Sequence, residues 1–172
     1  LVLALALALI QSVVPMIGAR LRDPALMNVA RSTALAQLVF AGASFVLLVT
    51  LHVTSDFSVV NVFENSHSTK PLIYKITGVW GNHEGSMLLW VSILALFGGL
   101  VAAFGNNLPL SLRARVLAVQ AWIASAFYLF ILTTSNPFAR LANPPIEGRD
   151  LNPILQDIGL AVHPPMLYLG YV

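Results

Sequence analysis

The sequence has no cysteine and very little charge. Its 172 residues include no Cys, and only 9% of them are Asp, Glu, Lys or Arg, against about 25% in soluble domains. Without cysteine, the chain forms no disulfide, carries no thiolate nucleophile and offers no sulfur ligand to a metal. Because 58% of its residues are hydrophobic, a soluble domain is excluded. The net charge of +2 and the lack of a basic run do not indicate nucleic-acid binding.

Apolar blocks long enough to cross a membrane account for much of the chain. At about 1.5 Å rise per residue, each reaches roughly 27–30 Å, the thickness of a bilayer core. Lipid offers no partner to free backbone groups, so these blocks must be helices. We predict an all-α fold, a polytopic transmembrane helical bundle with four spans and the start of a fifth at Pro164. The four blocks are residues 1–19, 32–51, 87–104 and 114–133.

The chain begins and ends inside an apolar block. It opens with LVLALALALIQSVV, without a Met or a basic flank, and the fifth block continues to Val172. We therefore expect residues 1–172 to be the amino-terminal part of one multi-span membrane domain. A second interpretation of the first block is the apolar core of a signal peptide.

Charged residues divide the connections into two classes. The short connections, about 20–31 and 105–115, hold five arginines and one Asp, whereas the long ones, about 52–86 and 134–163, hold four basic and six acidic residues. The two classes alternate along the chain, as the positive-inside rule requires. We predict that the short connections are cytoplasmic, and that the long connections and the first residues lie on the outer side.

The first outer loop contains KPLIYKITGVWGNHEGSMLLWV, residues 70–91. Pro71 favours the start of a short helix along the membrane surface. Gly81 and Gly85 permit a sharp turn after this helix, and Ser86 is placed to cap the following span.

Trp80 and Trp90 flank that turn. One interpretation is a flat aromatic surface beside His83 and Glu84, suited to a planar ligand. The other, favoured by the residues alone, is an interfacial aromatic anchor with a glycine turn and a helix cap. Adjacent side chains on a helix point in different directions, so His83 and Glu84 do not make a metal site.

The second outer loop leads into HPPMLYLGYV at the end of the chain. A residue before proline is pushed out of the helical region, so we predict that His163 is extended and that Pro164 is the first residue of the fifth helix. A backbone-fixed imidazole at the membrane rim is suited to ligate iron, although a lone histidine is more often an interfacial polar group. His52 and His67 lack this constraint and are interpreted as solvated loop residues.

The alternative function is that of a cofactor-free polytopic transporter or a membrane assembly scaffold. A transporter needs ionisable residues within its spans or helices broken near the midplane. The hints of this kind are Gln11, Pro15 and the Gly98-Gly99 pair, and small residues within spans more often serve helix packing.

Four motifs together resemble a known family. The segments SVVPMIGA, WGNHEGSMLLW, LNPILQD and HPPMLYLGYV occur in this order. They closely resemble the amino-terminal part of the CcmF-type cytochrome c maturation proteins, heme lyase subunits of the heme-handling superfamily. A related family in nitrite reductase assembly shares much of this pattern.

The resemblance implies a function in cytochrome c biogenesis at the bacterial inner membrane, with the first residues on the periplasmic side. Such proteins receive heme b from a heme chaperone and, with other cytochrome c maturation subunits, attach it to the CxxCH motif of an apocytochrome c. By resemblance, His163 is an axial ligand of the heme iron. The family motif also matches Trp80 and Trp90 but gives them no role to transfer, and we interpret them as an aromatic wall of the heme or partner surface. The second external histidine and a tryptophan-rich segment follow Val172 in the family. We therefore do not expect this chain to be active alone, and the sequence identifies no catalytic residue.

Overall fold

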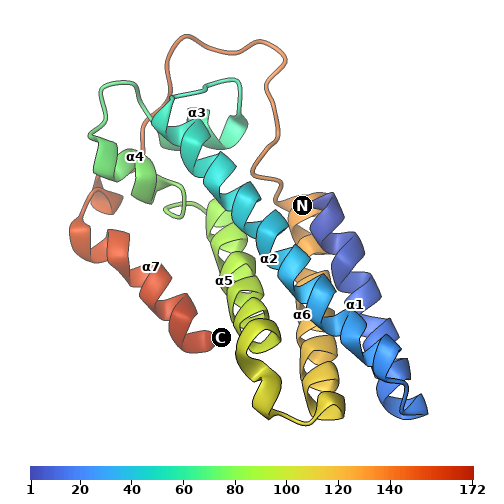
Figure 1. The fold of residues 1–172 in the computed structure, drawn as a ribbon. Helices are drawn as coiled ribbons and strands as arrows, with labels where there is room; N and C mark the ends of the chain where they lie inside the picture. The colour runs from blue at the N-terminus through green and yellow to red at the C-terminus, as the bar shows by residue number, and fades with distance from the viewer. The chain divides into compact units, whose positions relative to one another are not determined.

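The computed structural model describes residues 1–172, apart from the side chains of residues 155 and 160. The chain divides into two compact units, one of Leu1–Ala43 with Val91–Leu132 and one of Ser44–Trp90 with Thr133–Val172. The elements, labelled in Figure 1, are α1 (Val2–Leu21), α2 (Pro24–Val53), α3 (Val60–Asn65), α4 (Leu72–Gly78), α5 (His83–Phe104), the 3-10 helix η1 (Gly105–Asn107), α6 (Leu110–Thr134), the 3-10 helix η2 (Pro153–Leu155) and α7 (Ile158–Tyr171).

Four helices are long and apolar enough to cross a membrane, which confirms the predicted fold class. Each corresponds to one predicted apolar block but continues beyond it, because the polar residues at the block ends keep a helical backbone. The fifth predicted segment is the shorter helix α7, which is not among these candidate spans. The four candidates are Val2–Leu21, Pro24–Val53, His83–Asn107 and Leu110–Thr134.

The connection between α1 and α2 is a two-residue turn, shorter than the expected segment 20–31. Arg22 adopts the left-handed conformation with φ of 57°. Asp23 then caps α2, since its Oδ1 accepts the N–H of Ala25 at 2.8 Å, and Pro24 is the first helical residue. The other residues of that segment are compatible with a helix, so polarity alone overestimated the length of the connection.

In the first unit, the residues that hinted at broken helices serve packing. The helix α1 runs through Pro15 without interruption, and α5 runs through both glycines. A Cβ at Gly98 would collide with the amide of Gln120, and one at Gly99 would collide with the side chain of Leu38. The helix break expected of a transporter is therefore not found in α1 or α5.

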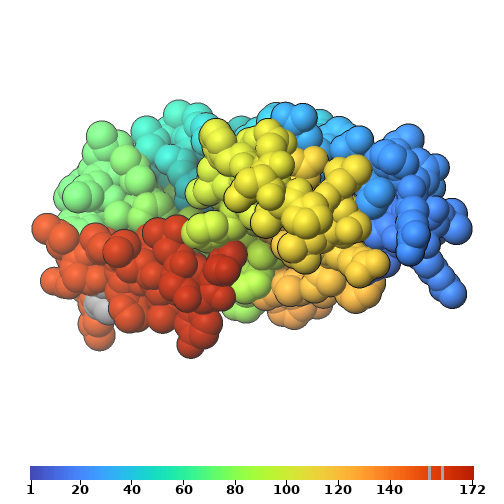
Figure 2. Space-filling model, turned by 60° about the horizontal axis from the view of Figure 1, so that its bottom comes forward, coloured from blue at the N-terminus to red at the C-terminus, as the bar shows by residue number. Residues whose placement is uncertain are grey.

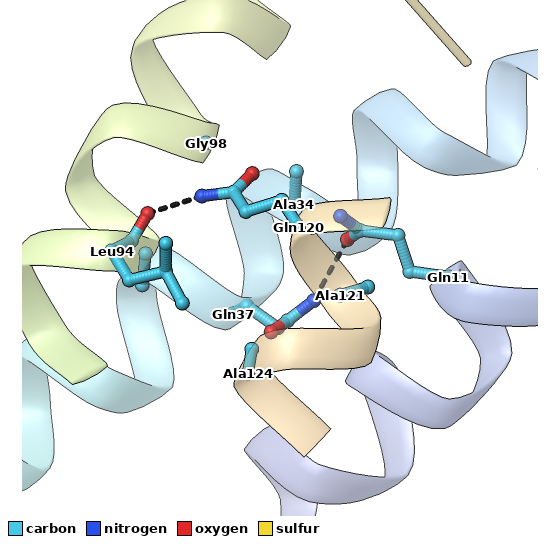
Figure 3. A pocket seen from close by; sticks show the side chains of 9 residues that line it. Gln11, Ala34, Gln37, Leu94, Gly98, Gln120, Ala121 and Ala124 are labelled. Atoms are coloured by element: carbon cyan, nitrogen blue, oxygen red, sulfur yellow. Dashed lines mark hydrogen bonds between the residues drawn. The ribbon is translucent and has the colours of Figure 1, made fainter. Parts of the chain in front are cut away.

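Glutamine side chains form a polar network in the interior of the first unit (Figure 3). Gln37 Nε2 donates to Gln11 Oε1 at 2.7 Å, and Gln11 Nε2 donates to the carbonyl of Leu117 at 2.8 Å. Gln120 donates to the carbonyl of Leu94 on α5. The three glutamines and Leu94 border a cavity of about 10 Å³, which is room for about one water molecule. Polar contacts thus join α1, α2, α5 and α6.

In the second unit, the two long connections, residues 54–82 and 135–157, are tied together. Val59 and Arg140 form an isolated antiparallel β-bridge. Further along, the N–H of Arg149 donates to the carbonyl of Phe63 at 2.7 Å, and the Arg149 guanidinium lies 5.1 Å from the centre of the Phe63 ring. Sequence reasoning identified both connections but gave no indication of this pairing.

A buried lysine strengthens that pairing. Lys70 is only 6% exposed, and its Nζ donates to the carbonyl of Asn65 at 2.8 Å. The carboxylate of Asp150 lies 3.9 Å from the same nitrogen. Burial lowers the pKa of Lys70 to about 8, while Asp150 opposes this shift. The ammonium group therefore connects the first long connection with the second.

Candidate functional site

A groove of about 400 Å³ in the second unit is lined by residues of the 70–91 segment and of α7. The helices α4 and α7 contact each other, and Figures 1 and 2 show α7, coloured red, beside the green segment that contains α4. The volume lies within the range of about 300–1,000 Å³ that is typical of cofactor sites. We call this feature the His163 groove. Its lining residues are Thr77, Trp80, Gly81, Asn82, His83, Ser86, Ala161, His163, Pro164 and Tyr168.

His163 lies inside a helix, so the prediction that it is extended is wrong. The helix α7 begins at Ile158 and includes both Pro164 and Pro165. A proline inside a helix removes one backbone hydrogen bond and crowds the preceding turn. The sequence rule expresses a preference of the residue before proline, and α7 keeps a helical backbone at His163 despite that preference. The His163 side chain is exposed and faces the groove.

Trp80 links the 70–91 segment to α7. Its indole N–H donates to the carbonyl of Ala161 at 2.7 Å. In a regular helix this carbonyl would accept the N–H four residues later, but that residue is Pro165, which has none. The Trp80 ring also stacks on Phe45, with ring centroids 6.2 Å apart and planes 20° apart. Trp80 therefore supplies a donor that α7 itself lacks.

The turn between α4 and α5 depends on Asn82 and Gly85. Asn82 Oδ1 accepts the N–H of Gly85 at 2.9 Å, so Asn82 caps α5 and the predicted cap, Ser86, is wrong. The hydroxyl of Ser86 instead donates to the carbonyl of Trp80 at 2.7 Å. None of the described glycines has a positive φ. Gly85 is required because a Cβ there would overlap the carbonyl oxygen of Val79.

Two other histidines occupy defined positions in the second unit. His83, the first residue of α5, lines the same groove as His163, and its Nε2 lies 3.1 Å from the hydroxyl of Ser135. His52, interpreted as a solvated residue, is fully buried, with Nδ1 3.1 Å from the carbonyl of Leu48. Its position near the end of a hydrophobic block gave no indication of this burial.

The structure brings only one of the two proposed wall tryptophans to His163. Trp90 is half-buried in α5 and is not among the described residues that line the groove, whereas Trp80 is. Tyr168 lines the groove from α7 and was not singled out from the sequence. Within the part of the chain that the structure describes, no group of three His, Asp or Glu side chains is arranged to hold a metal ion. The groove therefore presents individual imidazoles beside aromatic side chains.

Comparisons with known proteins agree with a helical membrane protein. Residues 80–172 match the family described as cytochrome C assembly protein. The whole chain is 89% identical to the cytochrome c-type biogenesis protein CycK of Bradyrhizobium diazoefficiens and covers 26% of its length. It is 50% identical to the cytochrome c-type biogenesis protein CcmF of Pseudomonas aeruginosa, again covering 26% of that protein.

A solved structure supports the same assignment. The structure titled cytochrome c heme lyase CcmF superposes with a TM-score of 0.81 at 26% sequence identity, over 98% of this chain and 26% of that one. The fold defines a polytopic helical membrane protein, and the chain belongs to the cytochrome c assembly protein family. It spans about a quarter of the length of the relatives that it matches.

Proposed function

We propose that the chain is part of a protein that handles heme b and attaches it covalently to apocytochrome c, as a subunit of a cytochrome c heme lyase. Family membership and the likeness to a structure titled as a heme lyase support this function. The observation that carries it is the His163 groove, where an exposed imidazole lies beside Trp80 in a cofactor-sized space. The quarter-length chain is not expected to perform the reaction alone.

The residues of the groove fit one side of a heme. A neutral imidazole nitrogen is a common axial ligand of heme iron, and His163 would be that ligand in this chain. Trp80 would form an aromatic wall beside it. His83 lines the same groove, but its Nε2 faces the hydroxyl of Ser135. We therefore assign the axial role to His163 alone, and leave Trp90 outside the wall.

The chain's own contribution is binding and orientation. Bound heme supplies the two vinyl groups to which the thiols of an apocytochrome add. The chain contains no cysteine, so both thiols of the CxxCH motif come with the substrate. His163 would hold the cofactor, and α7 would orient the imidazole. Orienting bound reactants in this way supplies several kcal/mol of the barrier reduction in enzymes, on the order of 7–11 kcal/mol at best.

The charge distribution supports a location for this site. The long connections, which carry the acidic excess, would face the periplasm together with the adjoining groove, and the arginine-rich turns would face the cytoplasm. On this side the protein would meet a heme chaperone, the apocytochrome and the other maturation subunits. The four spans would lie in the lipid of the bacterial inner membrane.

The absorption spectrum of the purified full-length protein tests the role of His163. We expect His163→Ala to remove the bands of externally bound heme, because the iron loses its ligand from this chain. His83→Ala is the matched control, since it removes an imidazole from the same groove, and it should keep those bands. A His163→Ala protein that retains the external heme spectrum and still matures cytochrome c would contradict the proposal.

A further inference from the structure

The helix α7 has few contacts that fix its position. Among its described side chains, Ala161 is buried, with 7% exposure, and the others are half-buried or exposed. Large apolar side chains such as Met166 and Tyr171 are 62% and 75% exposed. Burial of its own side chains therefore does little to hold the helix against the rest of the second unit.

The contact at Ala161 has an unusual origin. Pro165 has no N–H, so the helix cannot satisfy the Ala161 carbonyl by its usual bond to the residue four positions later. The Trp80 indole donates to this carbonyl at 2.7 Å. A buried carbonyl without a donor is unfavourable, so the tryptophan compensates for a bond that the proline removes.

Trp80 is itself held from two directions. Its ring stacks on Phe45 of α2, and its backbone carbonyl accepts the hydroxyl of Ser86 at 2.7 Å. The ring and the backbone of Trp80 therefore each have a contact outside α7. His163 is only two residues from the carbonyl that Trp80 contacts, and the two residues line the same groove.

We infer that Trp80 is a positioning residue for His163: its indole N–H replaces the backbone donor missing at Pro165 and thereby sets the position of α7. The consequence for heme rests on the proposed function, whereas the coupling between Trp80 and Pro165 does not. Pro165 then has a defined effect, because it leaves a carbonyl free to accept a hydrogen bond from a residue outside the helix.

A double-mutant cycle in the full-length protein tests this coupling. Hydrogen exchange of the α7 amides is measured for wild type, Trp80→Phe, Pro165→Ala and the double variant. Trp80→Phe keeps the aromatic ring but removes the donor, so we expect exchange to accelerate about fivefold, the equivalent of one net hydrogen bond. In the Pro165→Ala background the new N–H satisfies Ala161, so Trp80→Phe should change exchange little.

Trp122→Phe is the matched control, because its indole also donates to a backbone carbonyl, that of Ser12, at 2.9 Å within the first unit. It should leave α7 exchange unchanged. An effect of Trp80→Phe that is equally large in both backgrounds, or no effect in either, would overturn the inference. If Trp80→Phe fails to accumulate, Pro165→Ala should restore accumulation, and failure to do so also counts against it.

The heme spectrum separates this inference from the proposed function. Trp80→Phe should weaken the external heme bands, and Pro165→Ala should restore them in the double variant. If the exchange cycle shows coupling while His163→Ala keeps its external heme, the positioning role stands and the ligand role fails. If the spectrum depends on His163 but the cycle shows no coupling, the reverse conclusion follows.

Discussion

The carboxylate of Glu147 accepts two hydrogen bonds from Ser68, a residue 79 positions earlier in the chain. One comes from the backbone N–H at 2.9 Å and one from the hydroxyl at 2.6 Å. His67 adds a nitrogen 3.8 Å from the same carboxylate. Together these contacts lower the pKa of Glu147 to about 2, with the hydroxyl bond as the largest cause. The ionised carboxylate thus ties the two long connections together.

Acid should weaken the interaction between Glu147 and Ser68. The pKa of Glu147 is lowered from its ordinary 4.5 to about 2 in the folded protein, so its contribution to stability is fully present above pH 4.5 and is lost as the pH falls toward 2. The thermal unfolding midpoint of the full-length protein in detergent should decline across this interval. In Glu147→Gln the decline should be shallower, because the titrating group is absent. Glu64→Gln is the control, because it removes an exposed carboxylate from the first long connection. An equal slope in both variants would exclude the role of Glu147.

Gly85→Ala should destabilise the protein, although glycine to alanine in a helix usually stabilises. A Cβ at this position would overlap the Val79 carbonyl oxygen, so the turn between α4 and α5 must move. The expected cost is about 1–3 kcal/mol, as for other overpacked sites. Gly42→Ala in α2 is the control, because a Cβ there meets nothing within 4 Å, and it should stabilise by up to about 1 kcal/mol. The unfolding midpoints of the two variants, measured in parallel, give the sign of each change in stability. A stabilising Gly85→Ala would show that the close approach of Gly85 to the Val79 carbonyl does not constrain the turn.

The glutamine network should respond differently to one replacement than to two. Gln11→Leu removes the acceptor of Gln37 and leaves an amide N–H in the apolar interior, at a cost of about 1–3 kcal/mol. Removing both partners in Gln11→Leu with Gln37→Leu should cost less than the single variant, because no unpaired amide is left from that bond. Denaturant unfolding of the three proteins measures this difference. Additive costs would mean that the two amides are not coupled.

The local structure around Trp80 was predicted in kind from the sequence, but its individual contacts were not. The glycines and polar residues of this segment, and its position before a span, indicated a short helix, a turn and a capped helix. The structure contains all three, but Asn82 is the cap and Gly85 is needed for space rather than for backbone freedom. Sequence patterns give the kind of local structure because propensities act over a few residues. They do not give the partner of each atom, because Val79 and Gly85 approach only when the turn has formed.

The sequence by itself determined the four apolar blocks that form the candidate membrane spans, and it indicated the family. A long apolar block is stable in lipid only as a helix, so the number of such helices follows from composition and length. The tertiary structure alone decided that His52 is buried, that the long connections pair through Glu147 and Lys70, and that α7 begins before His163. Each of these depends on groups from distant parts of the chain. The helix α7 continues through Pro164 and Pro165, and the Ala161 carbonyl that Pro165 leaves without its helical donor accepts the indole N–H of Trp80, from a distant part of the chain.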